Sequence, residues 1–241
     1  MADWIDYYDS THTIYVSKLH RDVHFRGIAR DIIAYIPAPD AVVLDYSCGE
    51  ALCAPEVAAA CGELILAEPA PSVRSRLETR FATDPNISVR SPDDLHQRPD
   101  ASLDLAVMIS VAQYMTPAEL DSALALFRRL LKPTGALVVG DILDPGVGMA
   151  TDVLALLKLG ARHGFLMDAM RGMVRTALSD YRKLRTSIGL RSYSAAEMLA
   201  KLETAGFTAA RAPANVGHNP ARMTFIARPA SNNINHNHAR D

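Results

Sequence analysis

The chain has few cysteines, no long apolar run and no strong excess of either charge. Its three cysteines, Cys48, Cys53 and Cys61, match no zinc-finger spacing, and their odd number argues against a disulfide framework. No segment approaches the roughly 20 apolar residues of a membrane span, and the N-terminus lacks a basic region followed by an apolar run. These absences predict a cytoplasmic protein with reduced cysteines and no bound metal.

Charge and composition bound the domain count and the class of partner. A net charge of −2 over 241 residues gives no reason to expect a nucleic acid partner. With 49% hydrophobic residues, the chain can bury one large core or two small ones. We expect a single domain over residues 1–229, followed by a disordered polar tail at 230–241.

Glycine is scarce in the segment most typical of a cofactor loop. Residues 42–44 favour a buried parallel strand that ends in Asp45, and the turn after it contains a single glycine, Gly49. A phosphate-binding loop needs a lysine followed by serine or threonine, and a dinucleotide-binding loop needs three spaced glycines; both patterns are absent. The turn therefore predicts a nucleotide-type cofactor loop of another kind.

Strand and helix patterns alternate through the middle of the chain. Thr116 and Glu119 have the spacing of a capping box, with Pro117 in the first helical turn. Repeated strand–helix order predicts a doubly wound α/β sheet. The expected strands are 42–45, 64–67, 87–89, 103–109 and 136–141, and the expected helices are 52–60, 73–81 and 117–131.

The last third of the chain departs from this alternation. Ser194 and Glu197 form a second capping-box pattern, whose helix is expected to end at Gly206. Two strands follow at 207–211 and 223–227, and a closing hairpin of this kind cannot be parallel. The loop between them contains His218, Asn219 and Arg222.

The loop after Asp45, the element order and the closing hairpin together resemble class I S-adenosylmethionine-dependent methyltransferases of the small-molecule type, over roughly residues 41–227. The resemblance implies a seven-stranded, mainly parallel sheet of the Rossmann-like type, with helices on both faces. It also implies S-adenosylmethionine as methyl donor, S-adenosylhomocysteine as product, and no metal. Four parts are expected: a helical cap (1–40), a cofactor-binding core (41–145), a helical lid (146–193), and a C-terminal helix and hairpin (194–229).

The resemblance assigns the first cofactor contacts. Asp45 matches the acid that holds the amino-acid end of the cofactor, and Gly49 matches the central glycine of the loop. Ser47 and Ala51 stand where the family has its other two glycines. Glu68 matches the acid that accepts hydrogen bonds from both ribose hydroxyls. Without the resemblance, Asp45 would be only a helix N-terminal acid and Glu68 a surface acid.

The adenine contacts are open between two registers. Pro92 has no N–H, so a register of Ser91 then Pro92 would lose the usual backbone contact. In the preferred register, Asp93 contacts adenine and Asp94 supplies the backbone amide. Ser110, after the fourth strand, is a further expected cofactor contact.

Acceptor contacts are expected outside the sheet. The aromatics of residues 1–40, among them Tyr8 and Tyr15, would close over the cofactor or simply pack on the sheet edge. Residues 146–193 are basic and predict a methionine-rich amphipathic helix pair. Arg171 and Arg175 would bind a partly apolar, anionic acceptor; alternatively the segment rests on an anionic membrane, or is an ordinary helix hairpin. Asn219 and Arg222 are further candidate acceptor contacts.

Methyl transfer from a sulfonium needs little acid–base chemistry, because alignment in a dry site sets the rate. A base is useful if the acceptor is a neutral hydroxyl or a protonated amine. The candidate bases are His12, His20, His24, His218 and Tyr114, each of which could equally be structural. The methylated atom (O, N, S or C), the acceptor and the oligomeric state stay open.

Two alternative functions remain. A tRNA or protein methyltransferase would act on a macromolecule, but no basic tract with interleaved aromatics flanks the core. A non-catalytic cofactor-binding or regulatory protein would explain why Ser47 and Ala51 replace two family glycines.

Overall fold

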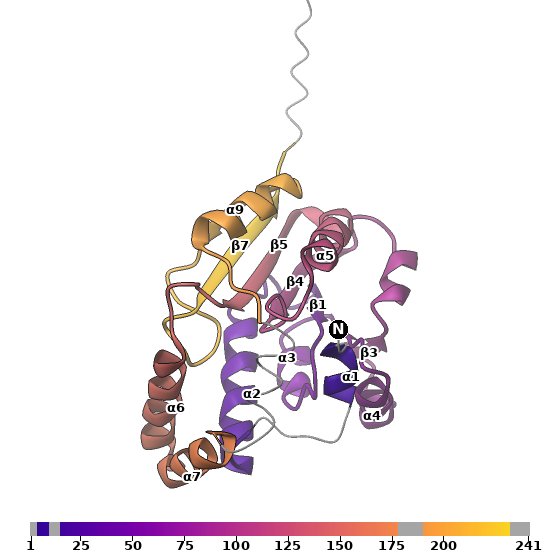
Figure 1. The fold of residues 1–241 in the computed structure, drawn as a ribbon. Coiled ribbons are helices and arrows are strands. Elements are labelled where there is room, and N and C mark those ends of the chain that lie inside the picture. Colours follow the sequence, from indigo (N-terminus) through magenta and orange to yellow (C-terminus); the bar gives the residue numbers. More distant parts are fainter. Residues whose placement is uncertain (1–3, 10–14, 178–189, 232–241) are drawn as a thin grey trace, which may run out of the picture.

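The computed structural model describes residues 4–9, 15–177 and 190–231 (Figure 1). Its sheet has the order β3-β2-β1-β4-β5-β7-β6, with parallel pairing from β3 to β5 and antiparallel pairing of β7 with both β5 and β6. This confirms the predicted α/β sheet with an antiparallel C-terminal pair. The strands are β1 (Val42–Tyr46), β2 (Glu63–Ala67), β3 (Ile87–Arg90), β4 (Leu103–Ile109), β5 (Leu131–Ile142), β6 (Phe207–Arg211) and β7 (Met223–Pro229).

Helices cover both faces of the sheet. Leu44 and Tyr46 face a core cluster built with α5 and α9, while Val43, which precedes Leu44, faces a second cluster built with α2, α3 and α4. In the described residues no helix is long and apolar enough to cross a membrane. The helices are α1 (Trp4–Asp9), α2 (Lys18–Ile33), α3 (Ala54–Ala58), α4 (Pro71–Phe81), the 3₁₀ helix η1 (Asp93–Gln97), α5 (Pro117–Leu130), α6 (Met149–His163), α7 (Leu166–Ala177) and α9 (Ala195–Thr204).

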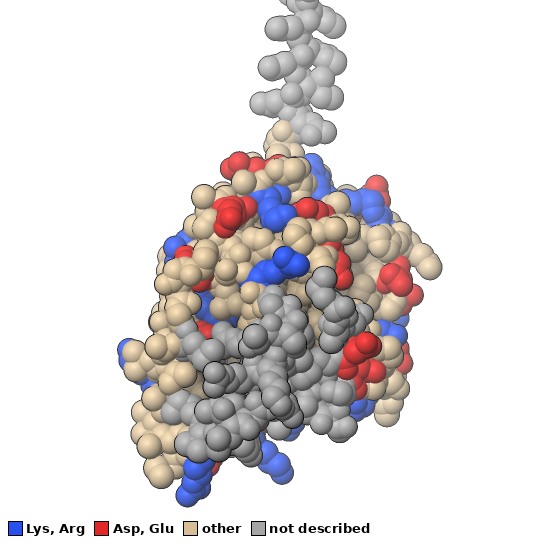
Figure 2. Space-filling model, viewed as in Figure 1, with Lys and Arg blue, Asp and Glu red and all other residues tan. Residues whose placement is uncertain are grey.

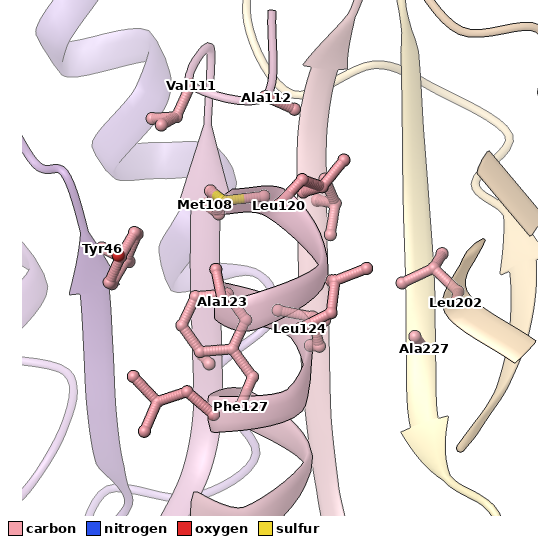
Figure 3. Close-up of a cluster of buried hydrophobic side chains, with 14 of the residues drawn as sticks. Tyr46, Met108, Val111, Ala112, Leu120, Ala123, Leu124, Phe127, Leu202 and Ala227 are labelled. Carbon is pink, nitrogen blue, oxygen red and sulfur yellow. The ribbon is translucent and has the colours of Figure 1, made fainter. Parts of the chain in front are cut away.

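Helix α5 shows how local signals and core packing agree. Its capping box forms as expected: Glu119 donates its backbone N–H to Thr116 Oγ1 at 3.2 Å, and the Thr116 N–H donates to Glu119 Oε2 at 2.6 Å. The buried face of the helix carries Phe127, whose ring meets Tyr46 of β1 edge-on at 5.0 Å between centroids (Figure 3). The second capping box, Ser194 with Glu197, also forms.

Two predicted boundaries are wrong. Strand β5 was expected to begin near residue 136, yet it begins at Leu131, because its register with β4 shifts between Leu103 and Leu105. The extra residues bulge out, and Lys132 bonds Asp104 at 2.8 Å across the shift. Helix α3 is shorter than the expected 52–60 and begins with a proline in its first turn.

The predicted lid forms a sharp corner between α6 and α7. Gly164 ends α6 with a φ of +83°, and a Cβ on Gly160 would lie 3.0 Å from Leu166 Cα. Gly172 of α7 lies against Val16 and leaves no room for a side chain. The corner therefore rests beside α2, at the end of the molecule opposite α9 (Figure 1). Residues 178–189 of the predicted lid and 232–241 of the predicted tail lie outside the described residues.

Phe127→Ala should destabilise the fold by about 3–5 kcal/mol, because it opens a cavity between α5 and the sheet. Chemical denaturation followed by circular dichroism measures this loss. Leu154→Ala is the control, since that side chain is 50% exposed and its loss should change the free energy of unfolding by less than about 0.5 kcal/mol. Similar losses for the two variants would contradict the assignment of the core.

Candidate functional site

A cavity of about 490 Å³ lies at the carboxyl ends of β1, β4 and β5. In a doubly wound sheet the chain leaves β1 and β4 toward opposite sides, which opens a crevice between their ends. Here the crevice is closed over by α1, α2, α6 and the β6–β7 loop, all of which contribute lining residues. Residues from all four predicted parts of the chain, which are 1–40, 41–145, 146–193 and 194–229, therefore line one cavity.

The backbone at this edge of the sheet is left-handed at several residues that are not glycine. Ser47 follows β1 with a φ of 58°, Ser110 follows β4 with 61°, and Asp141 near the end of β5 has 61°. Ala51 in the first loop has a φ of 41° beside Gly49 at 60°. A left-handed residue with a side chain costs about 1–2 kcal/mol, and such strain is typical of ligand-binding sites.

The loop after β1 is fixed by one carboxylate. Glu68, at the end of β2, accepts the N–H of Gly49 at Oε2 and the N–H of Ala70 at Oε1, both at 2.8 Å. Burial raises the pKa of Glu68, and these two amides act against that rise. Each carboxylate oxygen can accept a second hydrogen bond, so the predicted ribose hydroxyls still have acceptors.

Asp45 and Ser47 both line the cavity. Asp45 lines the cavity half-buried, and burial, with the neighbouring Glu68 charge, raises its pKa to about 7. The Ser47 hydroxyl is buried without a hydrogen-bond partner among the described residues. A Cβ placed on Gly49 would meet no atom within 4 Å, so its backbone faces open space. An unpaired acid, an unpaired hydroxyl and a bare backbone suit the ammonium and carboxylate of a cofactor's amino-acid end.

The preferred adenine contacts do not line the cavity. Asp93 and Asp94 both lie exposed at the start of η1. The Asp94 amide, expected to be available to adenine, instead donates to Ser91 Oγ at 3.2 Å, and the Ser91 amide donates to Asp94 Oδ2 at 2.8 Å. The structure therefore does not offer that amide to a ligand, and the Asp93 contact stays a prediction.

On the acceptor side, Arg222 joins the hairpin loop to both the sheet and the lid. It donates to Asp141 Oδ2 at 3.0 Å and to Asp152 Oδ2 of α6 at 3.1 Å. Asn219 adds a bond to Asp152 at 2.7 Å, and the Ser110 hydroxyl donates to Asp141 at 2.6 Å. These side chains are largely buried, so the network fixes the lid helix against the strand ends.

Three histidines form a wall of the same cavity. The rings of His20, His24 and His218 lie 6.2–6.4 Å apart, and Tyr15 packs on the first two at 5.5 Å. Burial, and secondarily the nearby His218, lowers the pKa of His20 to about 4 and the pKa of His24 to about 3. These imidazoles are neutral at physiological pH. No group of three His, Cys, Asp or Glu side chains within the described ranges could hold a metal ion.

The remaining predicted residues divide between the cavity and its surroundings. Tyr114 lines the cavity and stacks on Trp4 at 6.2 Å. Arg171 is exposed on α7 and does not line the cavity. Tyr8 and Arg175 belong to α1 and α7, but their side chains lie outside what the structure describes, as does the whole of His12.

Sequence reasoning missed the two acids that hold Arg222. Asp141 carries the same signal as Asp45, an acid at the end of an apolar strand, and could have been found by it. Asp152 gives no such signal, because it is one of several polar residues on a lid helix. Asp152 belongs to the site only because it pairs with Arg222, 70 residues later in the chain.

Comparison with known proteins agrees with this geometry. Residues 43–135 match a family model described as a methyltransferase domain. A search by sequence against curated proteins gave no match.

Among solved structures, the chain is similar to a putative methyltransferase complexed with the Haloferax volcanii Trm112 activator, with 16% identity, a TM-score of 0.60 and coverage of 96% of this chain and 100% of that one. It is also similar to DhpI with S-adenosylhomocysteine (12% identity, TM-score 0.58, 94% and 95% coverage). A third is the Burkholderia thailandensis 1,6-didemethyltoxoflavin-N1-methyltransferase (16% identity, TM-score 0.54, 86% and 78% coverage). At these identities the likeness shows the fold.

Asp45→Asn tests whether the raised pKa of this acid destabilises the protein without a ligand. Because its pKa of about 7 in the fold exceeds the ordinary 3.8, the folded protein loses stability as pH rises between these values, and the asparagine variant does not. In thermal melts without cofactor, the variant should gain stability over wild type progressively across this window and then level off.

Asp104→Asn is the matched control with the opposite sign. Burial alone would raise the pKa of Asp104, but hydrogen bonds from Lys132 and the Val42 amide lower it. The ionised form is therefore favoured in the fold, and this variant should lose stability at neutral pH. Parallel pH profiles for the two variants would refute the environment assigned to Asp45.

Proposed function

We propose that this chain, whose residues 43–135 match a methyltransferase-domain model, is a class I S-adenosylmethionine-dependent methyltransferase. Its acceptor in this proposal is small, planar and partly apolar, and neutral or weakly basic. The observation that carries the proposal is the loop of Asp45, Ser47 and Gly49, fixed by Glu68 at one end of a cavity with aromatic walls. S-adenosylmethionine supplies an electrophilic methyl group on a sulfonium. A cytoplasmic location is part of the proposal, supported by three free cysteines.

The residues around the first loop fit that cofactor. Asp45, ionised, would pair with the amino group, and its pKa would fall on binding as the charge is compensated. Glu68 would accept the ribose hydroxyls on the lone pairs that Gly49 and Ala70 leave free. Ser47 and Ala51 adopt the left-handed backbone that glycine would adopt at lower cost. The loop therefore keeps its shape without these two glycines, and their replacement is no argument for a non-catalytic protein.

The charges of the cavity do not favour an anionic acceptor. Arg21 pairs with Glu50 at 3.6 Å, and Arg222 is held between two aspartates. Arg171, the described arginine expected to bind an anion, lies outside the lining. The charged lining residues are the acids Asp45, Glu50, Glu68, Asp141 and Asp152 and the bases Arg21, Arg76 and Arg222. A neutral or weakly basic acceptor meets less repulsion there than an anion does.

The walls of the cavity favour a flat acceptor. Tyr15, His20 and His24 line one side as an edge-to-face and tilted ring cluster, and the stacked pair of Trp4 and Tyr114 lines another. Rings of this kind bind planar molecules through their faces and edges. The Burkholderia neighbour is described with both 1,6-didemethyltoxoflavin and S-adenosylhomocysteine bound, which supports, by fold alone, a small organic acceptor here.

His218 is the best placed proton acceptor, should the acceptor need one. His20 and His24 have pKa values of about 4 and 3, so they would hold a proton taken from a hydroxyl or amine only weakly. Burial also lowers the pKa of His218, but the carboxylate of Asp141 opposes this effect. We therefore assign His24 to acceptor packing and His218 to proton transfer.

Calorimetric titration with S-adenosylmethionine tests the cofactor assignment. Wild type should bind, and both Glu68→Ala and Gly49→Leu should weaken binding by at least about tenfold, since one removes acceptors and the other adds a strained side chain facing the ligand. Arg211→Gln is the control and should keep its affinity within about threefold, because Arg211 is exposed on β6 and does not line the cavity. No binding by wild type would end the enzyme proposal.

The acceptor is tested by incubating the enzyme and cofactor with planar phenols and nitrogen heterocycles and detecting a methyl mass increase. With an acceptor in hand, His218→Asn should lower turnover by about 100-fold at unchanged cofactor affinity, the usual contribution of a general base. His24→Phe should mainly raise the KM for the acceptor. Equal effects of the two variants on turnover would contradict the separate roles.

A further inference from the structure

The exposed large hydrophobic side chains of the described residues gather at one corner of the molecule. They are Leu19 of α2, Leu154 of α6, and Leu166, Met167 and Met170 of α7, with 37–59% of their surface exposed. Gly172 of α7 packs on Val16, which lies just before α2, and α7 also packs against α6. Soluble proteins rarely expose clustered apolar side chains without a partner.

Helix α7 has two distinct faces. Phe165, just before it, and Ala169 are buried, and Gly172 is packed on Val16 one turn later. On the opposite side, Leu166, Met167 and Met170 point outward, followed by the exposed Arg171. The spacing gives a continuous outward stripe of apolar side chains that ends in a cation.

Helix α6 adds a row of the same kind. Leu154, Lys158 and Arg162 are spaced by four residues and are all exposed, so they form one line along the helix. Asp152 and Leu156 lie on the opposite side of this helix and line the cavity. A single helix therefore separates the cavity from the exposed corner.

The charge of this corner is positive. Its exposed cations are Lys18, Lys158, Arg162 and Arg171, and its exposed acid is Asp22 of α2. The acid Asp152 is held by Arg222 on the other side of α6. Asp168 of α7 is half-buried. Figure 2 shows the corner, at the lower left, as largely tan surface with blue Lys and Arg side chains at its margins. We call Leu19, Leu154, Lys158, Arg162, Leu166, Met167, Met170 and Arg171 the docking face.

We propose that the docking face binds the surface of an anionic lipid bilayer. Leucine and methionine side chains would enter the boundary between headgroups and acyl chains, while lysine and arginine pair with anionic headgroups. A second copy of the chain is a poorer occupant, because the centre of a protein interface is depleted of lysine and of charge in general. The face thus matches a lipid surface in both polarity and charge.

Docking would place the lid helix between bilayer and cavity. Leu154 and Lys158 contact the lipid while Asp152 and Leu156 of the same helix line the cavity. If the proposed function holds, docking would bring an acceptor held in the bilayer to within the thickness of one helix, α6, of the cavity. The docking face itself does not depend on the identity of the acceptor.

Co-sedimentation of the full chain with vesicles tests the proposal. The protein should bind vesicles that contain phosphatidylglycerol in phosphatidylcholine, bind pure phosphatidylcholine weakly, and release as salt rises. Titration with S-adenosylmethionine on the same preparation gives a separate readout. If the protein binds vesicles but does not bind S-adenosylmethionine, the proposed function is wrong and the docking face is still supported.

Two double variants divide the contributions. Lys158→Gln with Arg162→Gln should weaken partitioning by about 25-fold, or about fivefold per cation. Met167→Gln with Met170→Gln should weaken it by roughly tenfold through lost apolar contact. Arg90→Gln with Arg211→Gln is the matched control, because both residues are exposed on the two edge strands of the sheet, outside the docking face. Thermal melts confirm that each variant folds.

Three outcomes would overturn the proposal. If the protein binds pure phosphatidylcholine vesicles as well as vesicles with phosphatidylglycerol, charge plays no role. If both docking-face variants bind vesicles as strongly as wild type does, the contact lies elsewhere on the protein. A dimer in analytical ultracentrifugation that dissociates in the Met167→Gln, Met170→Gln variant, together with no vesicle binding by wild type, would assign the face to self-association.

Discussion

The carboxylate of Glu68 is the interaction on which the cofactor end of the cavity depends. It stands at the end of β2, yet it accepts the amide of Gly49 in the loop that follows β1. A buried carboxylate needs hydrogen-bond donors, and the loop amide needs an acceptor, so each satisfies the other. This one contact joins two strand ends that the chain separates by a helix.

Ordering by Glu68 explains how the loop tolerates so few glycines. Ser47 and Ala51 adopt the left-handed backbone despite their side chains, at a cost of about 1–2 kcal/mol each. Similar strain at Ser110 and Asp141 shows that the cost is spread around the cavity edge and is not confined to one loop. The packed sheet beneath, with strands buried on both faces, is what holds these residues in place.

The end of the cavity beside α6 is organised differently, through a charged network. Arg222 ties α6 to the sheet by pairing with Asp141 and Asp152, which removes it from the set of cations available to an acceptor. The opposite side of α6 carries exposed apolar and basic residues. The basic character noted in the lid sequence therefore belongs, in the described residues, to the outer surface and not to the cavity.

The sequence by itself determined the sheet, its helices and most of the cofactor loop, because these depend on local signals. Apolar runs of strand length, two capping boxes and an acid after the first strand each act within a few residues. The shift in β5 escaped prediction, since it depends on how Leu131 and Ala136 pair with another strand. Only the tertiary structure decided which cations face the cavity, because the pairing of Arg222 with two distant acids and the outward direction of Arg171 arise from packing between helix, loop and sheet.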